Sequence, residues 1–286
     1  MISSYRSIVS PKTLAKFGAA FALAAAILYG FIPESGYGEQ NRILLTGSST
    51  IAPLAAELAR AYEKAHPGTR IDVETGGSSR GISDIRRGLA DIGMVSRALK
   101  PTESDLVSHL VARDGVALII HKTNPVDGLT SDQTSALYTR KIANWSALGG
   151  PDQKVVLVHK AQGRSTLEIF LKYFGLSDDD IRPDVVIGDN EQGIKTVAAN
   201  PSAIGYVSIG TAETAIEHGA SIKLLHLDGI AASTALVADG RFPMTRALNF
   251  VTKDTSSPKA ADFIAFAQSD SADALIRSLA FVPPKR

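Results

Sequence analysis

The feature that most constrains the fold is a repeated order of strand, Gly/Ser/Thr-rich loop and helix. It occurs three times, with loops at residues 46–50, 76–81 and 163–166, each after a short apolar run and before an amphipathic segment. Alternating strands and helices are typical of α/β domains, whose sheets contain parallel strands and carry helices on their faces. The order therefore predicts an α/β chain with three polar loops at helix starts.

Hydrophobic spacing assigns the other elements. In 53–65, for example, Leu54, Leu58 and Tyr62 recur every fourth residue, which is a helical period. The spacing predicts strands at 43–46, 71–75, 91–95, 116–121, 155–159, 204–208, 222–227 and 247–252, and helices at 53–65, 82–89, 131–140, 165–174, 260–267 and 272–279. The order starts as βαβαβ, and two α/β units joined near 115–120 and 226–232 fit it better than one continuous sheet.

The N-terminus differs from the rest of the chain. Arg6, Lys12 and Lys16 precede residues 17–32, which contain no charged side chain. A basic stretch followed by an apolar run is typical of an export signal. The run is shorter than the roughly 20 residues that span a bilayer as a helix, so cleavage is favoured over anchoring. We expect residues 1–38 to be a signal peptide or signal anchor and the protein to be periplasmic or otherwise extracytoplasmic.

Composition excludes several kinds of chemistry. The chain has 30 Lys and Arg against 29 Asp and Glu, with no long basic run, so nucleic acid is not an expected partner. It has no cysteine, which excludes disulfides, thiolate metal sites and cysteine nucleophiles. The 6 histidines show no metal-ligand spacing. No metal or cofactor is therefore expected, and any site must use oxygen and nitrogen groups.

The three polar loops favour an anion site. Each presents free backbone N–H groups and small hydroxyls at a helix start, where the helix dipole favours negative charge. A tetrahedral oxyanion needs many such donors, and a cleft on which the loops converge would supply them. Ser96 and Arg97 follow the strand at 91–95, and a guanidinium suits an oxyanion. The alternative is that these residues are ordinary helix caps, turn glycines and a solvated surface arginine.

One motif favours an enzyme instead. Residues 77–81 match G-x-S-x-G, the strand-to-helix elbow that carries the nucleophile of α/β-hydrolases, so Ser79 is a candidate nucleophile. Later histidines, including His218 and His226, follow in the order of the hydrolase triad. Against this reading, the strand before the elbow is only the second of the body, and no HGGG-type segment precedes it. A serine hydrolase using Ser79 is kept as the alternative, and no catalytic residue is expected.

Taken together, several segments resemble the phosphate-binding proteins of high-affinity phosphate ABC transporters. In chain order they are LTGSSTIAPL (45–54), GGSSRGISDI (76–85), DIGMVSRALK (91–100), DGVALIIHKTNPV (114–126), KIANWSALGG (141–150), GRSTLEIF (163–170) and NPSAIGYV (200–207). The resemblance implies the type 2 periplasmic-binding-protein fold, an α/β architecture of two lobes with a hinge and an interlobe ligand cleft. The lobes are expected at 39–118 (first lobe), 119–228 (second lobe) and 229–286 (return to the first).

The resemblance also implies site residues in two of the loops. Ser49, Thr50 and the backbone of Ile51 stand in the family's first phosphate-binding loop. Ser78 and Ser79 stand in the second. The first lobe is thereby expected to provide hydroxyl and backbone donors.

The remaining implied residues depart from the family's pattern. Arg164, Ser165 and Thr166 stand where the family reads Ser-Gly-Thr, so only Thr166 is identical. Lys160 takes the place of an arginine that pairs with the anion. Ser96 stands where many relatives have an aspartate that accepts the proton of protonated phosphate, which leaves the choice between phosphate and sulfate open.

We therefore expect an exported, non-catalytic solute-binding protein that captures a tetrahedral oxyanion, foremost phosphate. It would present the anion to an inner-membrane ABC permease, as a monomer and without a metal. Binding of sulfate or a molybdate-like oxyanion is the alternative within the same class.

Overall fold

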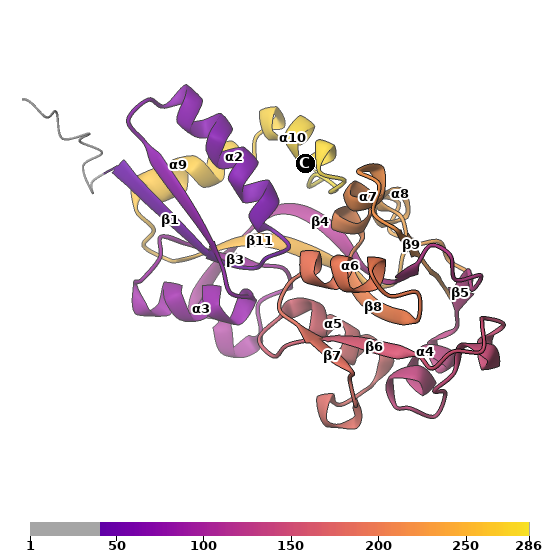
Figure 1. Ribbon diagram of the computed structural model, residues 1–286. Coiled ribbons are helices and arrows are strands. Elements are labelled where there is room, and N and C mark those ends of the chain that lie inside the picture. The colour runs from indigo at the N-terminus through magenta and orange to yellow at the C-terminus, as the bar shows by residue number, and fades with distance from the viewer. Residues whose placement is uncertain (1–40, 286) are drawn as a thin grey trace, which may run out of the picture. The chain divides into compact units, whose positions relative to one another are not determined.

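The computed structural model describes residues 41–285, in which strands and helices alternate (Figure 1). The strands are β1 Arg42–Gly47, β2 Arg70–Thr75, β3 Ile92–Val95, β4 Leu106–His121, β5 Gly128–Leu129, β6 Val156–Lys160, β7 Val185–Ile187, β8 Ala203–Ser208, β9 Ile222–Leu224, β10 His226–Leu227 and β11 Thr245–Lys253. The helices are α2 Ala52–Ala65, α3 Ser78–Arg87, α4 Ser131–Tyr138, α5 Ser165–Phe174, α6 Asn190–Ala198, α7 Ile209–Glu217, α8 Thr234–Ala238, α9 Pro258–Ala267 and α10 Asp273–Ser278. Short 3₁₀ turns include η2 Pro101–Glu103, η3 Trp145–Leu148, η4 Asp178–Asp180 and η5 Asp270–Ala272.

Two predicted elements begin much earlier than expected. Helix α3 starts at Ser78 rather than at residue 82. Its first turn has no apolar period, but Arg80 Nε donates to Asp84 Oδ2 at 3.0 Å, one turn along, and such a pair stabilises a helix. Strand β4 starts at Leu106 rather than at residue 116, because β11 pairs with it over its whole first half and so accommodates polar residues that break the apolar pattern.

The strands join in the order β2-β1-β3-β11-β4-β8-β6-β7, and β9 also pairs with β4. Strand β1 is parallel to both β2 and β3, which confirms the βαβαβ start. Strand β11 runs antiparallel to β3 and β4. The long strand β4 continues from β11 to β8, so these 9 strands form one connected sheet where the sequence favoured two separate units, and β5 and β10 pair in a small second sheet.

The buried hydrophobic residues fall into separate clusters, and these define two lobes. One cluster joins β1, α2 and β3 to the C-terminal helices α9 and α10, and we call this part the first lobe. Another joins α4, α5, β6 and β8, a further one packs α6 and α7 on β6 and β8, and we call these parts together the second lobe. Figure 1 shows the indigo and yellow segments together in the first lobe, and the pink and orange segments in the second.

Strands β4 and β11 connect the lobes. In β4, Ala112 belongs to the first-lobe cluster and Val116 to the second. At β11, Met244 before the strand lies in the second-lobe cluster and Leu248 within it lies in the first. The boundaries at 118/119 and 228/229 stay a prediction, and this cluster membership leads us to propose that the return to the first lobe lies at the start of β11.

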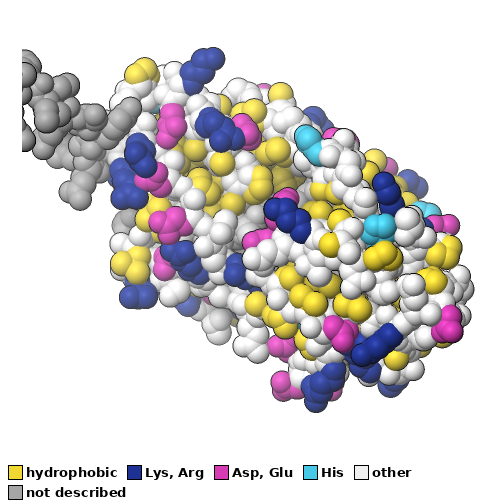
Figure 2. Space-filling model, viewed as in Figure 1, with side chains coloured by type: hydrophobic (Ala, Val, Ile, Leu, Met, Phe, Trp, Pro, Cys, Tyr) yellow, Lys and Arg dark blue, Asp and Glu magenta, His cyan; other side chains and the backbone are white. Residues whose placement is uncertain are grey.

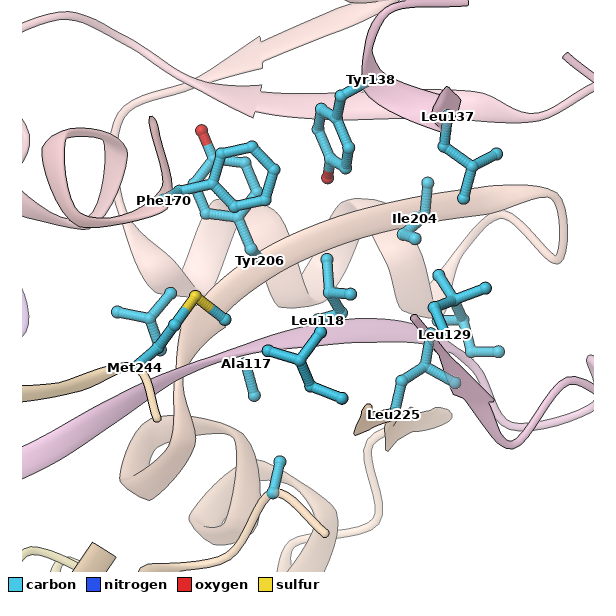
Figure 3. Packing of buried hydrophobic residues seen from close by; sticks show 14 of the residues in the cluster. Ala117, Leu118, Leu129, Leu137, Tyr138, Phe170, Ile204, Tyr206, Leu225 and Met244 are labelled. Atoms are coloured by element: carbon cyan, nitrogen blue, oxygen red, sulfur yellow. The ribbon is translucent and has the colours of Figure 1, made fainter. Parts of the chain in front are cut away.

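The core of the second lobe holds α5 against β6 and β8 (Figure 3). The Phe170 ring of α5 stacks on Tyr206 of β8, with centroids 4.0 Å apart. The Tyr206 hydroxyl bonds to Nδ1 of His159 at 2.9 Å and accepts the Lys160 amide at 3.3 Å. Aromatic pairs add about 1 kcal/mol each beyond area burial. These contacts fix the start of α5 relative to the end of β6.

Within residues 41–285, no helix combines the length and apolarity needed to cross a bilayer. The same residues contain no group of three or more His, Asp or Glu side chains arranged to hold a metal ion. Basic and acidic side chains are interspersed on the face shown in Figure 2. The predicted signal peptide or anchor, residues 1–38, lies outside the described residues.

Candidate functional site

Four helix starts meet where the lobes touch. Ser165, first residue of α5, donates its Oγ to Oγ of Ser78, first residue of α3, at 2.6 Å. Asn190, first residue of α6, donates Nδ2 to Oγ1 of Thr50, just before α2, at 3.2 Å. Each pair joins one helix of the first lobe to one of the second. Because N-terminal turns carry free N–H groups and partial positive charge, their meeting creates a place suited to an anion.

The hydroxyls at these helix starts belong to a closed set of contacts, which we call the polar ring. Its members are Ser48, Thr50, Ser78, Ser96, Ser165, Thr166 and Arg246, all of them buried.

Within the first lobe, the ring runs through backbone and hydroxyl groups. The Thr50 amide donates to Ser48 Oγ at 3.2 Å, and Ser48 Oγ donates to Ser96 Oγ at 3.0 Å. The Ser96 amide then donates to Ser78 Oγ at 3.1 Å. Three loops that are far apart in sequence therefore place small hydroxyls side by side.

Arg246 closes the ring between the lobes. Its Nη1 donates to Thr166 Oγ1 at 2.8 Å and its Nη2 to Thr50 Oγ1 at 3.2 Å. Asp114 holds the guanidinium through Nε at 3.0 Å and Nη2 at 2.7 Å, and it also accepts the Gly210 amide. The two side chains face each other across β4 and β11, each 1% exposed. A paired cation is therefore fixed in the ring.

Lys160, at the end of β6, supplies a second cation beside the ring. Its Nζ donates to Asn190 Oδ1 at 3.2 Å, and the residue is 3% exposed. Burial lowers the pKa of Lys160 to about 7; nearby Asp189 opposes this shift, while Arg246 and Arg164 add to it. An anion bound next to this ammonium would favour its charged form.

Arg164 lies across the loops that precede α3 and α6. A Cβ at Gly77 would stand 2.9 Å from Arg164 Cδ, and one at Gly188 would stand 3.3 Å from its Nη2. The Nε of Arg164 is buried and has no hydrogen-bond partner among the described residues. The guanidinium thus reaches between the lobes with donor capacity unused.

Three further predicted residues lie beside the ring but are not part of it. Ser49 is half-buried in the turn before α2. The side chain of Ile51 is packed in the first-lobe core, so only its backbone could face a ligand. Ser79 is exposed, and its amide donates to Gly163 O of the other lobe at 3.3 Å.

The hydrolase alternative needs a histidine at Ser79. Among the hydrogen bonds of residues 41–285, none joins Ser79 to a histidine. His218 instead bonds Thr214 O, and His226 is exposed on β10. His159 does pair with Asp178 at 2.8 Å, but its other ring nitrogen is bonded to Tyr206. The described geometry therefore assembles no triad around Ser79.

Arg97 has carboxylate partners in this structure. Its Nη1 and Nη2 donate to Glu103 at 2.7 and 2.9 Å, and its Nε lies 3.1 Å from Glu168 Oε2. Although burial favours the neutral acid, the bonds from Arg97 and the Lys100 amide lower the pKa of Glu103. The predicted role of Arg97 in binding the anion stays a prediction, and its guanidinium here is held between two acids.

Sequence reasoning did not single out Ser48, Asp114, Asn190 or Arg246. Ser48 belongs to the first polar loop, and Asp114 opens one of the segments that carried the resemblance. Arg246 directly precedes an apolar strand, and a cation in that place is a sequence signal for a buried, paired charge. Asn190 lies on α6, a helix that the hydrophobic spacing did not reveal.

Comparison with known proteins places these features in context. A family model described as a PBP superfamily domain matches residues 34–271. The chain is 28% identical over 246 residues to the phosphate-binding protein PstS of Bacillus subtilis, an alignment that covers 83% of this chain and 79% of that protein. It is 25% identical over 281 residues to PstS of Pseudomonas aeruginosa, covering 88% of this chain and 86% of that one.

Solved structures agree in fold. A structure named as a phosphate ABC transporter substrate-binding protein from Clostridium perfringens, with bound phosphate, superimposes with a TM-score of 0.80 at 29% identity, covering 86% of this chain and 100% of that one. An ABC-type phosphate transport receptor from Vibrio cholerae gives a TM-score of 0.70 at 30% identity, covering 85% and 100%.

Proposed function

The chain belongs to the PBP superfamily and, within it, to the phosphate-binding proteins of ABC transporters, and we propose that it captures phosphate outside the cytoplasm and presents it to an ABC permease. It acts by binding and release, without a catalytic step. The relatives named above are likewise binding and transport proteins.

The observation that carries this proposal is the polar ring. It gathers hydroxyls from three loops of the first lobe and one helix start of the second around Arg246. Hydroxyl groups can turn from one another toward an entering oxyanion and donate to it, because each has a rotatable proton. The ring thus offers the many donors that a tetrahedral oxyanion requires.

Charge at the site is net positive, which suits an anion. Lys160 and Arg164 approach the ring from the second lobe, and Arg246 completes it from β11. Asp114 offsets Arg246, and Asp189 lies near Lys160. Charge-assisted hydrogen bonds to a phosphate oxygen are stronger than neutral ones, so these side chains would provide most of the affinity and the hydroxyls the geometry.

Capture by hinge motion follows from where the ring's members lie. Ser78 and Thr50 belong to the first lobe and Ser165 and Thr166 to the second, while β4 and β11 connect the two. A ligand that contacts both lobes binds the closed state better than the open one and therefore shifts the equilibrium toward closure. The closed, loaded form is what we propose the permease receives.

Export is part of the proposal and rests on the basic and apolar pattern of the N-terminal 38 residues. We propose a periplasmic or otherwise extracytoplasmic location, with membrane anchoring by 17–32 as the variant in which the segment is kept. N-terminal sequencing of the protein recovered from the cell envelope distinguishes the two, because a cleaved chain begins near residue 39.

Selectivity between phosphate and sulfate depends on an acceptor for the proton that phosphate keeps near neutral pH. By the resemblance, Ser96 stands where many relatives have an aspartate, and its Oγ lies in the ring. Two nearby carboxylates are used elsewhere: Asp189 caps α6 through Gln192, and Glu168 pairs with Arg97 and Lys100. We therefore propose that the site discriminates only weakly between phosphate and sulfate or molybdate.

Calorimetric titration of the purified protein with phosphate, arsenate, sulfate and molybdate tests this function. We expect saturable heat with phosphate and arsenate, and weaker heat with sulfate. Binding of none of these anions would contradict the proposed function. Labelling of Ser79 by a fluorophosphonate would instead support the hydrolase alternative.

A further inference from the structure

A second set of contacts between the lobes lies beside the polar ring and contains no hydroxyl. Glu168 stands in the first turn of α5, two residues after Thr166. Its Oε2 lies 2.8 Å from Lys100 Nζ and 3.1 Å from Arg97 Nε. Helix α5 packs in the second-lobe core, whereas the segment after β3 packs on the first lobe. Both ion pairs therefore cross between the lobes.

The first-lobe side of this contact is held in place. Glu103 of η2 receives both terminal nitrogens of Arg97 and also the Lys100 amide, at 2.8 Å. The Arg97 carbonyl accepts Asn249 Nδ2 of β11 at 2.8 Å. The terminal nitrogens of Arg97 are thus engaged. Its Nε makes no hydrogen bond among the described residues and lies at an ion-pair distance of 3.1 Å from Glu168 Oε2.

Resting on the proposed function, we propose that Glu168 is a positioning residue whose pairing with Arg97 and Lys100 forms an interlobe latch. The latch pulls the first turn of α5 against the first lobe. That turn carries Ser165 and Thr166, so the latch brings their hydroxyls to Ser78 and Arg246. It thereby sets how long the lobes stay closed around the anion.

The latch is reached by solvent, so its strength can change with the salt concentration. It borders a cleft of about 760 Å³ whose lining includes Arg97, Lys100, Glu168 and Lys172. The side chain of Lys100 is 49% exposed and that of Glu168 28%. Ion pairs reached by solvent are weakened by salt, so the latch makes closure depend on ionic strength.

Glu168→Gln isolates the latch from the rest of the fold. The substitution keeps the side chain's size and removes its charge. Arg97 remains paired with Glu103, so no buried cation loses its only partner. Glu191→Gln is the matched control, since Glu191 stands in the first turn of α6 and takes part in none of the ion pairs found within residues 41–285.

The first readout is the distance between the lobes, measured without any ligand. Arg87 and Lys141 are exposed residues of the first and second lobe, and because the chain has no cysteine, both can be replaced by spin-labelled cysteines. Double electron–electron resonance gives the distribution of distances between the two labels, and so the ratio of open to closed molecules. We expect Glu168→Gln to raise this ratio about threefold to tenfold. The control Glu191→Gln should give the same distance distribution as the spin-labelled protein without either substitution.

A double-mutant comparison with Lys100→Gln tells whether Glu168→Gln acts through its ion pair or merely destabilises the closed state by another route. The effects of Lys100→Gln and Glu168→Gln on the open-to-closed ratio should combine to less than their product, because each removes the same pair. Added NaCl should open the parent more than Glu168→Gln. Identical distance distributions in Glu168→Gln and Glu191→Gln would overturn the latch, whether or not phosphate binds.

Release of ³²P-phosphate, chased with unlabelled phosphate, gives the second readout. Glu168→Gln should release the label about threefold to tenfold faster, with a smaller change in the association rate. Failure of the parent to retain phosphate would contradict the proposed function, while the distance measurement would still decide on the latch.

Discussion

At the scale of single residues, Arg246 and Asp114 combine a structural and a binding role. The pair is buried, and Arg246 also joins Thr50 to Thr166. Arg246→Gln should lower the free energy of unfolding by about 3 to 5 kcal/mol, because it leaves the Asp114 carboxylate buried without its partner. Urea denaturation measures this loss.

A second substitution separates the two roles. In Arg246→Gln/Asp114→Asn no buried charge remains unpaired, so much of the stability should return while phosphate affinity stays low. If stability and affinity returned together, the guanidinium would have only a structural role.

The burial of Lys160 leads to a prediction of how the free energy of unfolding depends on pH. Its pKa is about 7 in the folded protein, against 10.5 for an exposed lysine, chiefly because of burial. Between these values the unfolded chain binds more protons than the folded one, so the contribution of Lys160 to stability rises with pH. The free energy of unfolding of the phosphate-free wild type, relative to Lys160→Met, should therefore increase from pH 7 to pH 10. A difference that stays flat or falls over this interval would contradict the burial of an ammonium here.

The hydroxyl of Ser96 leads to a prediction about the preference for phosphate over sulfate. Its hydroxyl can donate or accept, so it suits either protonated phosphate or sulfate. An aspartate would accept the phosphate proton but repel sulfate, which carries no proton. Ser96→Asp should thus raise the preference for phosphate over sulfate by about tenfold, or about 1.4 kcal/mol. Titrations with both anions measure the ratio, and an unchanged ratio would mean that Ser96 does not face the ligand.

At the scale of elements, helix α3 depends on a close approach to β1 and β3. A Cβ at Gly81 would lie 2.9 Å from Thr46 O and 3.0 Å from Met94 O, and both are backbone atoms that cannot move aside. Gly81→Ala should therefore push α3 outward, destabilise the protein by about 1 to 3 kcal/mol and displace Ser78 from the ring. Thermal unfolding and phosphate titration measure the two effects. Ser83→Ala, on the exposed side of the same helix, should change neither.

Elements with a strong local pattern could be predicted, and those stabilised by distant partners could not. Helix α5 has the predicted bounds because a Ser-Thr start precedes an apolar period. Helix α6 begins with Asn190 and further polar residues and has few apolar positions, so its role emerges only through contact with Thr50. The first half of β4 mixes apolar and polar residues without a continuous apolar run, and it forms a strand because β11 pairs with it.

The candidate site follows the same division. The three loops were visible in sequence because Gly, Ser and Thr cluster before helices. Arg246 was not, because its partner Asp114 is 132 positions away and only the antiparallel register of β4 and β11 brings them together.

At the scale of the whole molecule, contacts between the lobes should respond to ligand as a group. The Ser79 amide bonds to Gly163 O of the other lobe. Phosphate should slow hydrogen exchange in peptides that cover 76–81 and 161–166 by about tenfold or more, because opening exposes these amides. Exchange in 117–120, inside β4, serves as the internal reference. Equal slowing in all three segments would indicate general stabilisation rather than closure.

The position of Arg246 on a connecting strand has a consequence for the order of events during capture. A rotation of one lobe about β4 and β11 displaces atoms in proportion to their distance from those strands, and Arg246 and Asp114 lie on them. The guanidinium is therefore oriented before the lobes meet. An anion diffusing in encounters this preformed charge first and gains the hydroxyls of the second lobe afterwards. The rate of encounter should depend on Arg246 and on ionic strength, whereas Ser165 and Thr166 should determine whether an encounter becomes a capture.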